Sequence, residues 1–291
     1  LGTGVRIMTR NCVFYDGPSM LDGSPIFAAL VGLDKPSANT ATGTMAQIYI
    51  MRSDVSPVAA IATGADASIC GECKMRGRVV SLDTATHMAW GLDTNRRRLL
   101  LRRIESARDH GESTLNIERA CYVRTEQAPT VIFKAYAAGS YPNVTPRVAA
   151  NMVRGGELRV GAYGDSAALP IGAVRPLADA ADVLTNYTHG AGYVPGRAKR
   201  LADFTMASAD SPEQALKYQK EGLRTFRVSS DYTTRDDGTR LVMDLLPGER
   251  QCPKTLDHSV TCIDCGLCDG NRRGIAANIV APVHGRGAAY L

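Results

Sequence analysis

The chain has 291 residues, of which 44% are hydrophobic and 22% charged, a composition typical of a soluble globular protein. It contains no run of roughly 20 apolar residues, so a helical membrane protein is excluded. The first ten residues, LGTGVRIMTR, show no basic-then-apolar signal pattern. Cysteines clustered as C-x₂-C indicate a reducing compartment and metal rather than disulfides. We therefore expect a cytoplasmic protein with no membrane partner.

The formal net charge is +5, and it comes from 27 arginines and 7 lysines against 29 acidic residues. Arginine offers a planar fork that pairs with phosphate and stacks on bases. The bias is compatible with a nucleic-acid or nucleotide partner, although a GC-rich genome produces the same bias. Charge alone does not decide between these explanations.

The first part of the chain, residues 1–65, is predicted to be β-rich. Residues 7–15 and 47–51 carry strand-forming side chains, and Gly-, Ser- and Pro-containing turns separate them. We expect this segment to precede a larger domain over residues 66–250.

A C-x₂-C pair, Cys70 and Cys73, opens that larger domain. With Cys121 it forms a possible three-thiolate site, and 47 residues lie between Cys73 and Cys121. Three thiolates on a [4Fe–4S] cluster leave one iron open for a small ligand. If all three face one point, the residues between must leave the domain and return. The alternative is a surface turn and a buried core thiol.

A basic helical insertion is predicted over residues 79–118. Residues 93–110 have a helical pattern with Asp93 or Thr94 as the N-cap. Its arginines either form a solvated face or contact nucleic acid. The candidate substrate or nucleic-acid contacts in the chain are Arg96, Arg97, Arg102, Arg124 and Arg227.

After Cys121, strands and helices alternate regularly. Candidate strands span 157–163, 182–188, 202–208, 223–229, 241–246 and 277–283. Candidate helices span 145–154, 170–180 and 211–222, the last with Ser211 as N-cap and proline at its first position. This alternation predicts an α/β fold with a parallel sheet, closed as a full or partial (β/α) barrel.

The predicted strands end in polar residues, where a parallel barrel places its chemistry. Four successive strands lead to Asp165, His189, Asp210 and Asp231. Such groups can supply general acid and base catalysis or bind a cationic ligand. Each can also be a helix cap or a loop residue, Asp210 in particular.

The C-terminal segment, residues 251–291, holds a cysteine-rich knuckle. Its four thiols lie within 17 residues, and we expect them to bind one metal. Four thiolates suit either tetrahedral zinc or a closed iron–sulfur cluster. The predicted ligands are Cys252, Cys262, Cys265 and Cys268, with His284 as a weaker candidate.

The order of these blocks resembles an uncharacterised family of bacteriophage and prophage proteins. The resemblance covers roughly residues 35–286 and rests on SICGEC, CYVRTEQAP, FKAYAAGSYP, LRVGAYGDSAALP, NYTHG, MASADS, GLRTFRV and CIDCGLCDG. That family is remotely similar to phage proteins with a radical S-adenosylmethionine-like barrel, which carry a compact cysteine triad.

The resemblance implies roles for individual residues. Cys70, Cys73 and Cys121 would hold an open cluster, and the C-terminal cysteines an auxiliary one. The expected contacts to S-adenosylmethionine are Gly161, Gly164, Asp165 and Tyr187. The protein would act in the cytoplasm of the host cell.

Three functions remain open. The first is an iron–sulfur enzyme of radical S-adenosylmethionine type that acts on nucleic acid or a nucleotide. The second is a zinc-stabilised barrel resembling tRNA-guanine transglycosylases and their phage DNA-modifying relatives, in which Asp165 or Asp231 would attack the sugar carbon as nucleophile while the base is flipped into the barrel mouth. The third is a non-enzymatic zinc protein whose basic helix binds DNA in a salt-sensitive manner.

Overall fold

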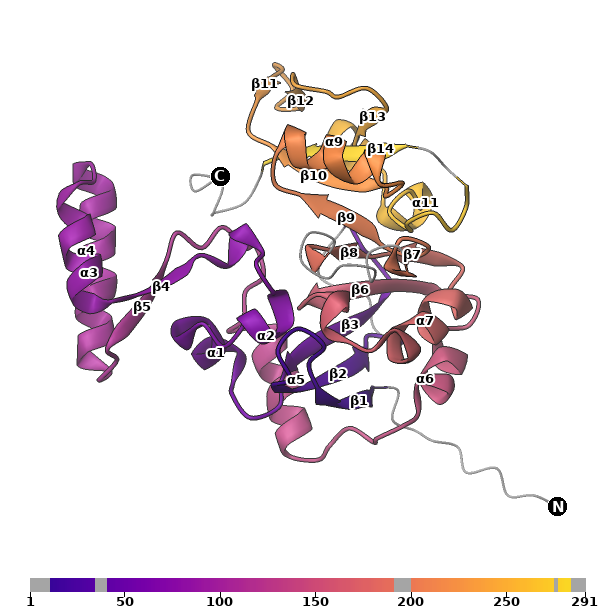
Figure 1. Ribbon diagram of the computed structural model, residues 1–291, viewed down its shortest axis with the longest axis horizontal. Coiled ribbons are helices and arrows are strands. Elements are labelled where there is room, and N and C mark those ends of the chain that lie inside the picture. Colours follow the sequence, from indigo (N-terminus) through magenta and orange to yellow (C-terminus); the bar gives the residue numbers. More distant parts are fainter. Residues whose placement is uncertain (1–10, 35–40, 191–199, 275–276, 284–291) are drawn as a thin grey trace.

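Parallel strands run through the centre of the molecule (Figure 1). The computed structural model describes residues 11–34, 41–190, 200–274 and 277–283. In the first sheet, β3 (Ala46–Arg52), β6 (Glu157–Tyr163) and β7 (Val183–Thr185) pair in parallel. A single residue, Asn186, separates β7 from β8, with which the second sheet begins.

The second sheet is parallel throughout, in the order β13-β14-β10-β9-β8. Its strands are β8 (Tyr187–Thr188), β9 (Met206–Ala209), β10 (Thr225–Ser229), β14 (Asn278–Pro282) and β13 (Glu249–Gln251). The predicted α/β class with parallel strands is therefore confirmed. A full barrel is wrong for the described residues, because β13 at one end and β1 at the other do not pair.

An antiparallel hairpin extends the first sheet at its outer edge. β1 (Cys12–Pro18) pairs with β2 (Pro25–Val31), and β2 pairs with β3. The sequence did not predict β2, because PIFAALV is apolar on both faces and lacks the alternation of a half-buried strand. Part of the strand predicted over 7–15 lies outside the described residues.

Helices pack against both sheets. α5 (Ala128–Ala137), α6 (Pro146–Val153) and α7 (Ile171–Ala180) pack against the first sheet through Ile132, Val153 and Leu177, among others. α9 (Pro212–Lys220) packs on the second sheet. Both Ser211 and Thr145 accept a hydrogen bond at their helix N-terminus, at 3.2 and 3.3 Å, ahead of a proline.

A helical hairpin on a two-stranded ribbon projects from the sheets (Figure 1). It consists of β4 (Arg78–Ser81), α3 (Leu82–Trp90), α4 (Thr94–Asp109) and β5 (Thr114–Ile117). It has a small core of its own, which includes Leu100 and Ile104. Asp93 caps α4, as predicted, by accepting from two backbone N–H groups.

The strand predicted over 241–246 is wrong. β12 (Arg240–Val242) instead pairs antiparallel with β11 (Tyr232–Thr234), outside the parallel sheet. The cause is the tight turn at Gly238, which joins the two short strands as a hairpin. Gly238 has a φ of 83°, a conformation that glycine readily adopts in such turns.

Short helices complete the description. They are α1 (Pro57–Thr63), α2 (Ala67–Cys70), α10 (Pro253–Leu256) and α11 (Cys262–Cys265), with 3₁₀ turns at Lys74–Arg76 and Ser166–Ala168. None of the helices in the described ranges has the length and apolar content needed to cross a bilayer.

Candidate site at the carboxyl ends of the strands

Three of the predicted strand-end residues meet at the carboxyl edge of the parallel strands. The backbone N–H of His189, after β8, donates to Asp165 Oδ2, after β6, at 2.7 Å. His189 Nε2 lies 3.4 Å from Asp210 Oδ1, after β9. The sequence predicted that these residues follow strands of a parallel sheet, and they follow β6, β8 and β9. It did not show that they touch.

The C-x₂-C segment reaches the same edge because it follows β3. Asp165 N–H donates to the carbonyl of Ile69 at 2.6 Å, directly before Cys70. Arg76 holds the loop in shape, with its guanidinium 2.7 and 3.1 Å from Asp66 Oδ1 and 2.8 Å from the Gly71 carbonyl. The ion pair is nearly buried on the Asp66 side, at 2% exposure. A charge-assisted clamp of this kind fixes the loop more firmly than neutral hydrogen bonds do.

Cys121 returns to the C-x₂-C segment through the β4–β5 ribbon. Arg78 pairs with Ile117 at the base of the ribbon. The backbone N–H groups of Ala120 and Cys121 then both donate to the carbonyl of Met75, at 3.1 and 2.8 Å. The 47 residues that separate the cysteines in sequence therefore form an excursion that begins and ends at one place.

Gly77 makes this closure possible. Its φ is 75°, and a Cβ at this position would lie 2.3 Å from the carbonyl oxygen of Ile117. Any side chain would therefore push the two arms of the ribbon apart.

The three thiols lie within electrostatic range of one another. Burial raises the pKa of Cys70 well above its usual value, and Asp66, Cys73 and Cys121 raise it further. Burial also raises the pKa of Cys121, with Cys73 adding to the effect. Within the described ranges, however, no three His, Cys, Asp or Glu side chains are arranged as a ready-made metal site.

His189 links the thiols to the carboxylates. Burial favours its neutral form, but hydrogen bonds to Asp210 and Cys73 outweigh burial and raise its pKa well above the usual value. These two partners therefore favour the protonated form of the imidazole.

Buried polar atoms without a hydrogen-bond partner surround this group. They are Tyr163 Oη, Ser166 Oγ and Arg119 Nε. Tyr163 is 2% exposed, and its pKa is raised first by burial and then by Cys70 and Asp66. Arg119 also donates to the Cys121 carbonyl at 2.9 Å. Such orphaned groups are rare in proteins, and two of the eight among the described residues, Tyr163 Oη and Arg119 Nε, belong to side chains in electrostatic range of the thiols.

Asp165 is fully engaged by its own surroundings. Oδ1 accepts from Ala167 N–H at 2.8 Å and from Thr188 Oγ1 at 2.6 Å, while Oδ2 accepts from His189 N–H. The two glycines predicted to contact the cofactor are required by the backbone conformation, whether or not a cofactor binds. Gly161 and Gly164 have φ of 71° and 84°, and a Cβ on Gly164 would lie 2.5 Å from the Ile50 carbonyl.

The four C-terminal cysteines also lie near one another. The pKa of Cys268 is raised first by burial; Tyr187 opposes the shift by a hydrogen bond, and Cys252, Cys262 and Cys265 add to it. Backbone hydrogen bonds tie the knuckle to distant segments. Cys252 N–H donates to Val280, Cys262 N–H to Ala41, and the Cys268 carbonyl accepts from Asn186 N–H, at 2.8 to 3.0 Å. His284 lies outside the described residues.

Two predicted cofactor or catalytic residues lie elsewhere. Tyr187 is beside Cys268 and stacks at a tilt on Phe226, 4.7 Å between ring centres, so it belongs to the C-terminal cysteines. Adjacent strand residues point to opposite faces, which separates Tyr187 from Thr188 and the first site. Asp231 is exposed at the start of the β11–β12 hairpin.

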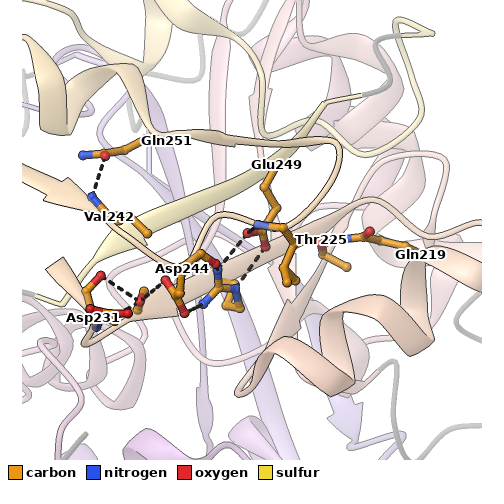
Figure 2. A network of polar contacts seen from close by, with 10 residues as sticks. Gln219, Thr225, Asp231, Val242, Asp244, Glu249 and Gln251 are labelled. Carbon is orange, nitrogen blue, oxygen red and sulfur yellow. Dashed lines mark hydrogen bonds and ion pairs between the residues drawn. The ribbon is translucent and has the colours of Figure 1, made fainter.

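Arg227 does not serve as a nucleic-acid contact. It is 1% exposed, and its guanidinium donates to both oxygens of Glu249, at 3.0 and 2.7 Å, and to Asp244 Oδ2 at 2.7 Å. Figure 2 shows this network, with Asp231 nearby. A guanidinium saturated by two carboxylates is not available to a phosphate.

The predicted arginines of the projecting hairpin lie at its surface. Arg96 is exposed and 3.5 Å from Asp93, and Arg102 is exposed. Arg97 instead caps α3, since it donates to the carbonyls of Ala89, Trp90 and Leu92. Arg124 is also exposed and lines a cleft beside β3 and β6.

The sequence analysis did not identify Arg159 as a candidate functional residue. Arg159, within β6, lines the same cleft and donates to Tyr122 Oη at 2.8 Å. One signal was present: a lone arginine between apolar residues of a central strand has to point into a polar site.

Comparison of the chain with protein-family models, curated proteins and solved structures gave no significant match.

Proposed function

We propose that this protein is a metal-cluster enzyme in which Cys70, Cys73 and Cys121 hold an iron–sulfur cluster. One observation carries the proposal: the β4–β5 ribbon returns Cys121 to the carbonyl of Met75, beside the C-x₂-C loop and at the carboxyl ends of the strands. Parallel α/β folds place their chemistry at this edge. Three thiolates would leave one iron open to a small ligand.

The surroundings of the thiols fit such a group. Burying neutral thiols beside Tyr163 Oη and Arg119 Nε leaves polar atoms unpaired, and an inorganic cluster with acceptor sulfurs would supply partners. Because metal binding deprotonates thiols, it also offsets the raised pKa of Cys70 and Cys121. The ligand side chains would have to move together on binding, since no ready-made site exists among the described residues.

The open iron is proposed to bind S-adenosylmethionine, which supplies radical chemistry when bound. The chain's own part is positioning. Asp165 fixes the turn after β6 and the backbone of His189, and Asp210 holds the imidazole ring beside Cys73. These contacts argue against base exchange with Asp165 as nucleophile, because both its oxygens are already occupied. The alternative nucleophile, Asp231, is exposed after β10, at the start of the β11–β12 hairpin.

The C-terminal cysteines are proposed to bind a second metal, as zinc or an auxiliary cluster. Four thiolates leave no open position, so the role would be structural. The knuckle contacts residues 41, 186 and 280 through its backbone. A metal there would fasten the two sheets to each other.

The proposed substrate is nucleic acid or a nucleotide. The projecting hairpin supports this choice with an exposed basic surface on α4, next to exposed Trp90 and Leu99. If this surface contacts phosphate, Arg98→Glu and Arg102→Glu should weaken binding to a single-stranded oligonucleotide and reduce its salt dependence. Equal salt dependence in the variant and the wild type would exclude the contact.

The proposal is tested by anaerobic purification with iron, zinc and the absorption spectrum measured on one sample. The wild type should absorb broadly near ~400 nm and carry roughly 4–8 irons per chain. Cys121→Ala should lose about 4 of them. Cys12→Ala is the matched control, because Cys12 is a buried core thiol that contacts Met152. A colourless wild-type protein that carries only zinc would contradict the proposal. So would an iron content in Cys121→Ala equal to that of the wild type.

A further inference from the structure

A cleft of about 210 Å³ opens between β3, β6 and the segment from Cys121 into α5. Its polar lining consists of Gln47, Tyr49, Tyr122, Arg124, Gln127 and Arg159. It therefore contains two arginines, two tyrosines, two amides and no carboxylate.

Arg159 has an unusual environment for a buried charge. It is 8% exposed, its Nη2 donates to Tyr122 Oη at 2.8 Å, and its guanidinium lies 6.0 Å from the centre of the Tyr122 ring. Over the described ranges, no Asp or Glu lies within ion-pair distance of it. Other buried arginines, such as Arg224 and Arg227, do have carboxylate partners. A buried guanidinium facing a cleft without a carboxylate is a site for an external anion.

The rest of the cleft indicates what accompanies the anion. Arg124 adds a second, exposed guanidinium at the rim. Tyr122 is 53% exposed and presents a ring on which a base can stack, as in single-strand binding sites. The exposed amide of Gln127 can donate to and accept from a base edge, whereas Gln47 is buried and its Oε1 already accepts from Tyr49 Oη at 3.0 Å.

The cleft lies between the two cysteine groups. Tyr122 directly follows Cys121, and Arg159 is in electrostatic range of Cys262. Its volume is below the roughly 300–1,000 Å³ of pockets that enclose a whole drug-sized ligand. A nucleotide bound there would therefore lie partly in the cleft and partly on its rim, where Tyr122 and Arg124 are exposed.

We propose that this cleft binds one nucleotide, with its phosphate on Arg159 and Arg124 and its base against Tyr122 and Tyr49. The inference deepens the proposed function by naming the substrate class and rests on it for catalysis, although binding itself needs no cluster. The nucleotide can be free or part of a single strand, and the experiment distinguishes these sources.

The test is isothermal titration calorimetry with metal content measured on every sample. The probes are the four 5′-ribonucleoside monophosphates, the corresponding nucleosides, inorganic phosphate and a single-stranded hexanucleotide. Arg159→Gln removes the buried charge, and Arg124→Gln removes the exposed one without disturbing the core. Arg154→Gln is the control, since Arg154 is exposed at the end of α6 and, among the described residues, its side chain hydrogen-bonds to Asn151 alone.

We expect a nucleoside monophosphate or the hexanucleotide to bind, and Arg124→Gln and Arg159→Gln to weaken that binding about 10- to 100-fold. Arg154→Gln should bind as the wild type does. Tighter binding of the hexanucleotide than of every monophosphate identifies the strand as the source. Binding of phosphate as tight as that of nucleotide would overturn base recognition. No binding, or unchanged binding in Arg124→Gln at unchanged iron content, would overturn the whole inference. If the wild-type protein binds nucleotide but carries no iron, the result would count against the proposed cluster and would still support nucleotide binding in this cleft.

Discussion

Asp165→Asn should destabilise the protein, although it only replaces one carboxylate oxygen with an amide nitrogen. Asp165 is 6% exposed and accepts three hydrogen bonds, two on Oδ1 and one on Oδ2. In the asparagine variant the amide oxygen can keep two of these bonds. The amide nitrogen then faces the N–H of His189, so that two donors oppose each other.

The size of the effect follows from these contacts. A hydrogen bond to a charged acceptor contributes about 1.5–3 kcal/mol, and a buried unpaired donor costs about 1–3 kcal/mol. Because the loop can relax, we expect a loss of roughly 2–4 kcal/mol in the free energy of unfolding. Urea unfolding followed by circular dichroism, at equal metal loading, measures it.

The matched control is Asp231→Asn, at the position two residues after β10. Asp231 is exposed, and exposed substitutions usually change stability by about 0.5 kcal/mol or less. The reasoning is refuted if Asp165→Asn unfolds at the wild-type urea concentration, or if Asp231→Asn is destabilised as strongly.

Three further outcomes are expected in urea or pH titrations. Arg227→Met should lose about 3–5 kcal/mol, because it leaves the fully buried Glu249 without its partner; a loss below 1 kcal/mol would contradict the geometry. Burial would raise the pKa of Asp244, but hydrogen bonds from Arg227 and Ser229 lower it, so its stabilisation is present above an ordinary aspartate pKa and is lost below about pH 4; an Asp244→Asn variant should show a flatter acid limb than the wild type. Ile104→Ala, in the core of the projecting hairpin, should cost about 2–5 kcal/mol, whereas Leu99→Ala, 60% exposed on the same helix, should be near neutral; equal effects would mean that the hairpin has no packed core.

Much of the fold could be predicted because the local signals were strong. The strand at 157–163 and the helices near 146–153, 171–180 and 212–220 match the structure closely. Each follows from a cap, a proline at the first position or a glycine turn. Such signals act within a few residues and need no knowledge of the partner.

The failures came where distant residues decide the structure. β2 is apolar on both faces because it is covered on both, and nothing local reveals that. The 241–246 segment has strand-forming residues, but its pairing was decided by the turn before it. Closure of the barrel depends on strands at opposite ends of the sequence, which local patterns do not describe.

The candidate site was predicted in its residue types and only partly in its geometry. Asp165, His189 and Asp210 do meet. Tyr187, expected to contact S-adenosylmethionine, lies beside Cys268 instead. The sequence predicted an insertion over residues 79–118 between Cys73 and Cys121, but not the two-stranded ribbon at its base, because the ribbon depends on the pairing of residues 78–81 with residues 114–117.

The most direct test of the central claim is electron paramagnetic resonance of the anaerobically reduced protein, recorded with and without S-adenosylmethionine. A three-thiolate cluster with an open iron predicts a spectrum that changes when S-adenosylmethionine is added, and predicts that the changing signal is absent from Cys121→Ala. An identical spectrum in both conditions, or an unaltered response in Cys121→Ala, would contradict a shared site for Cys70, Cys73 and Cys121.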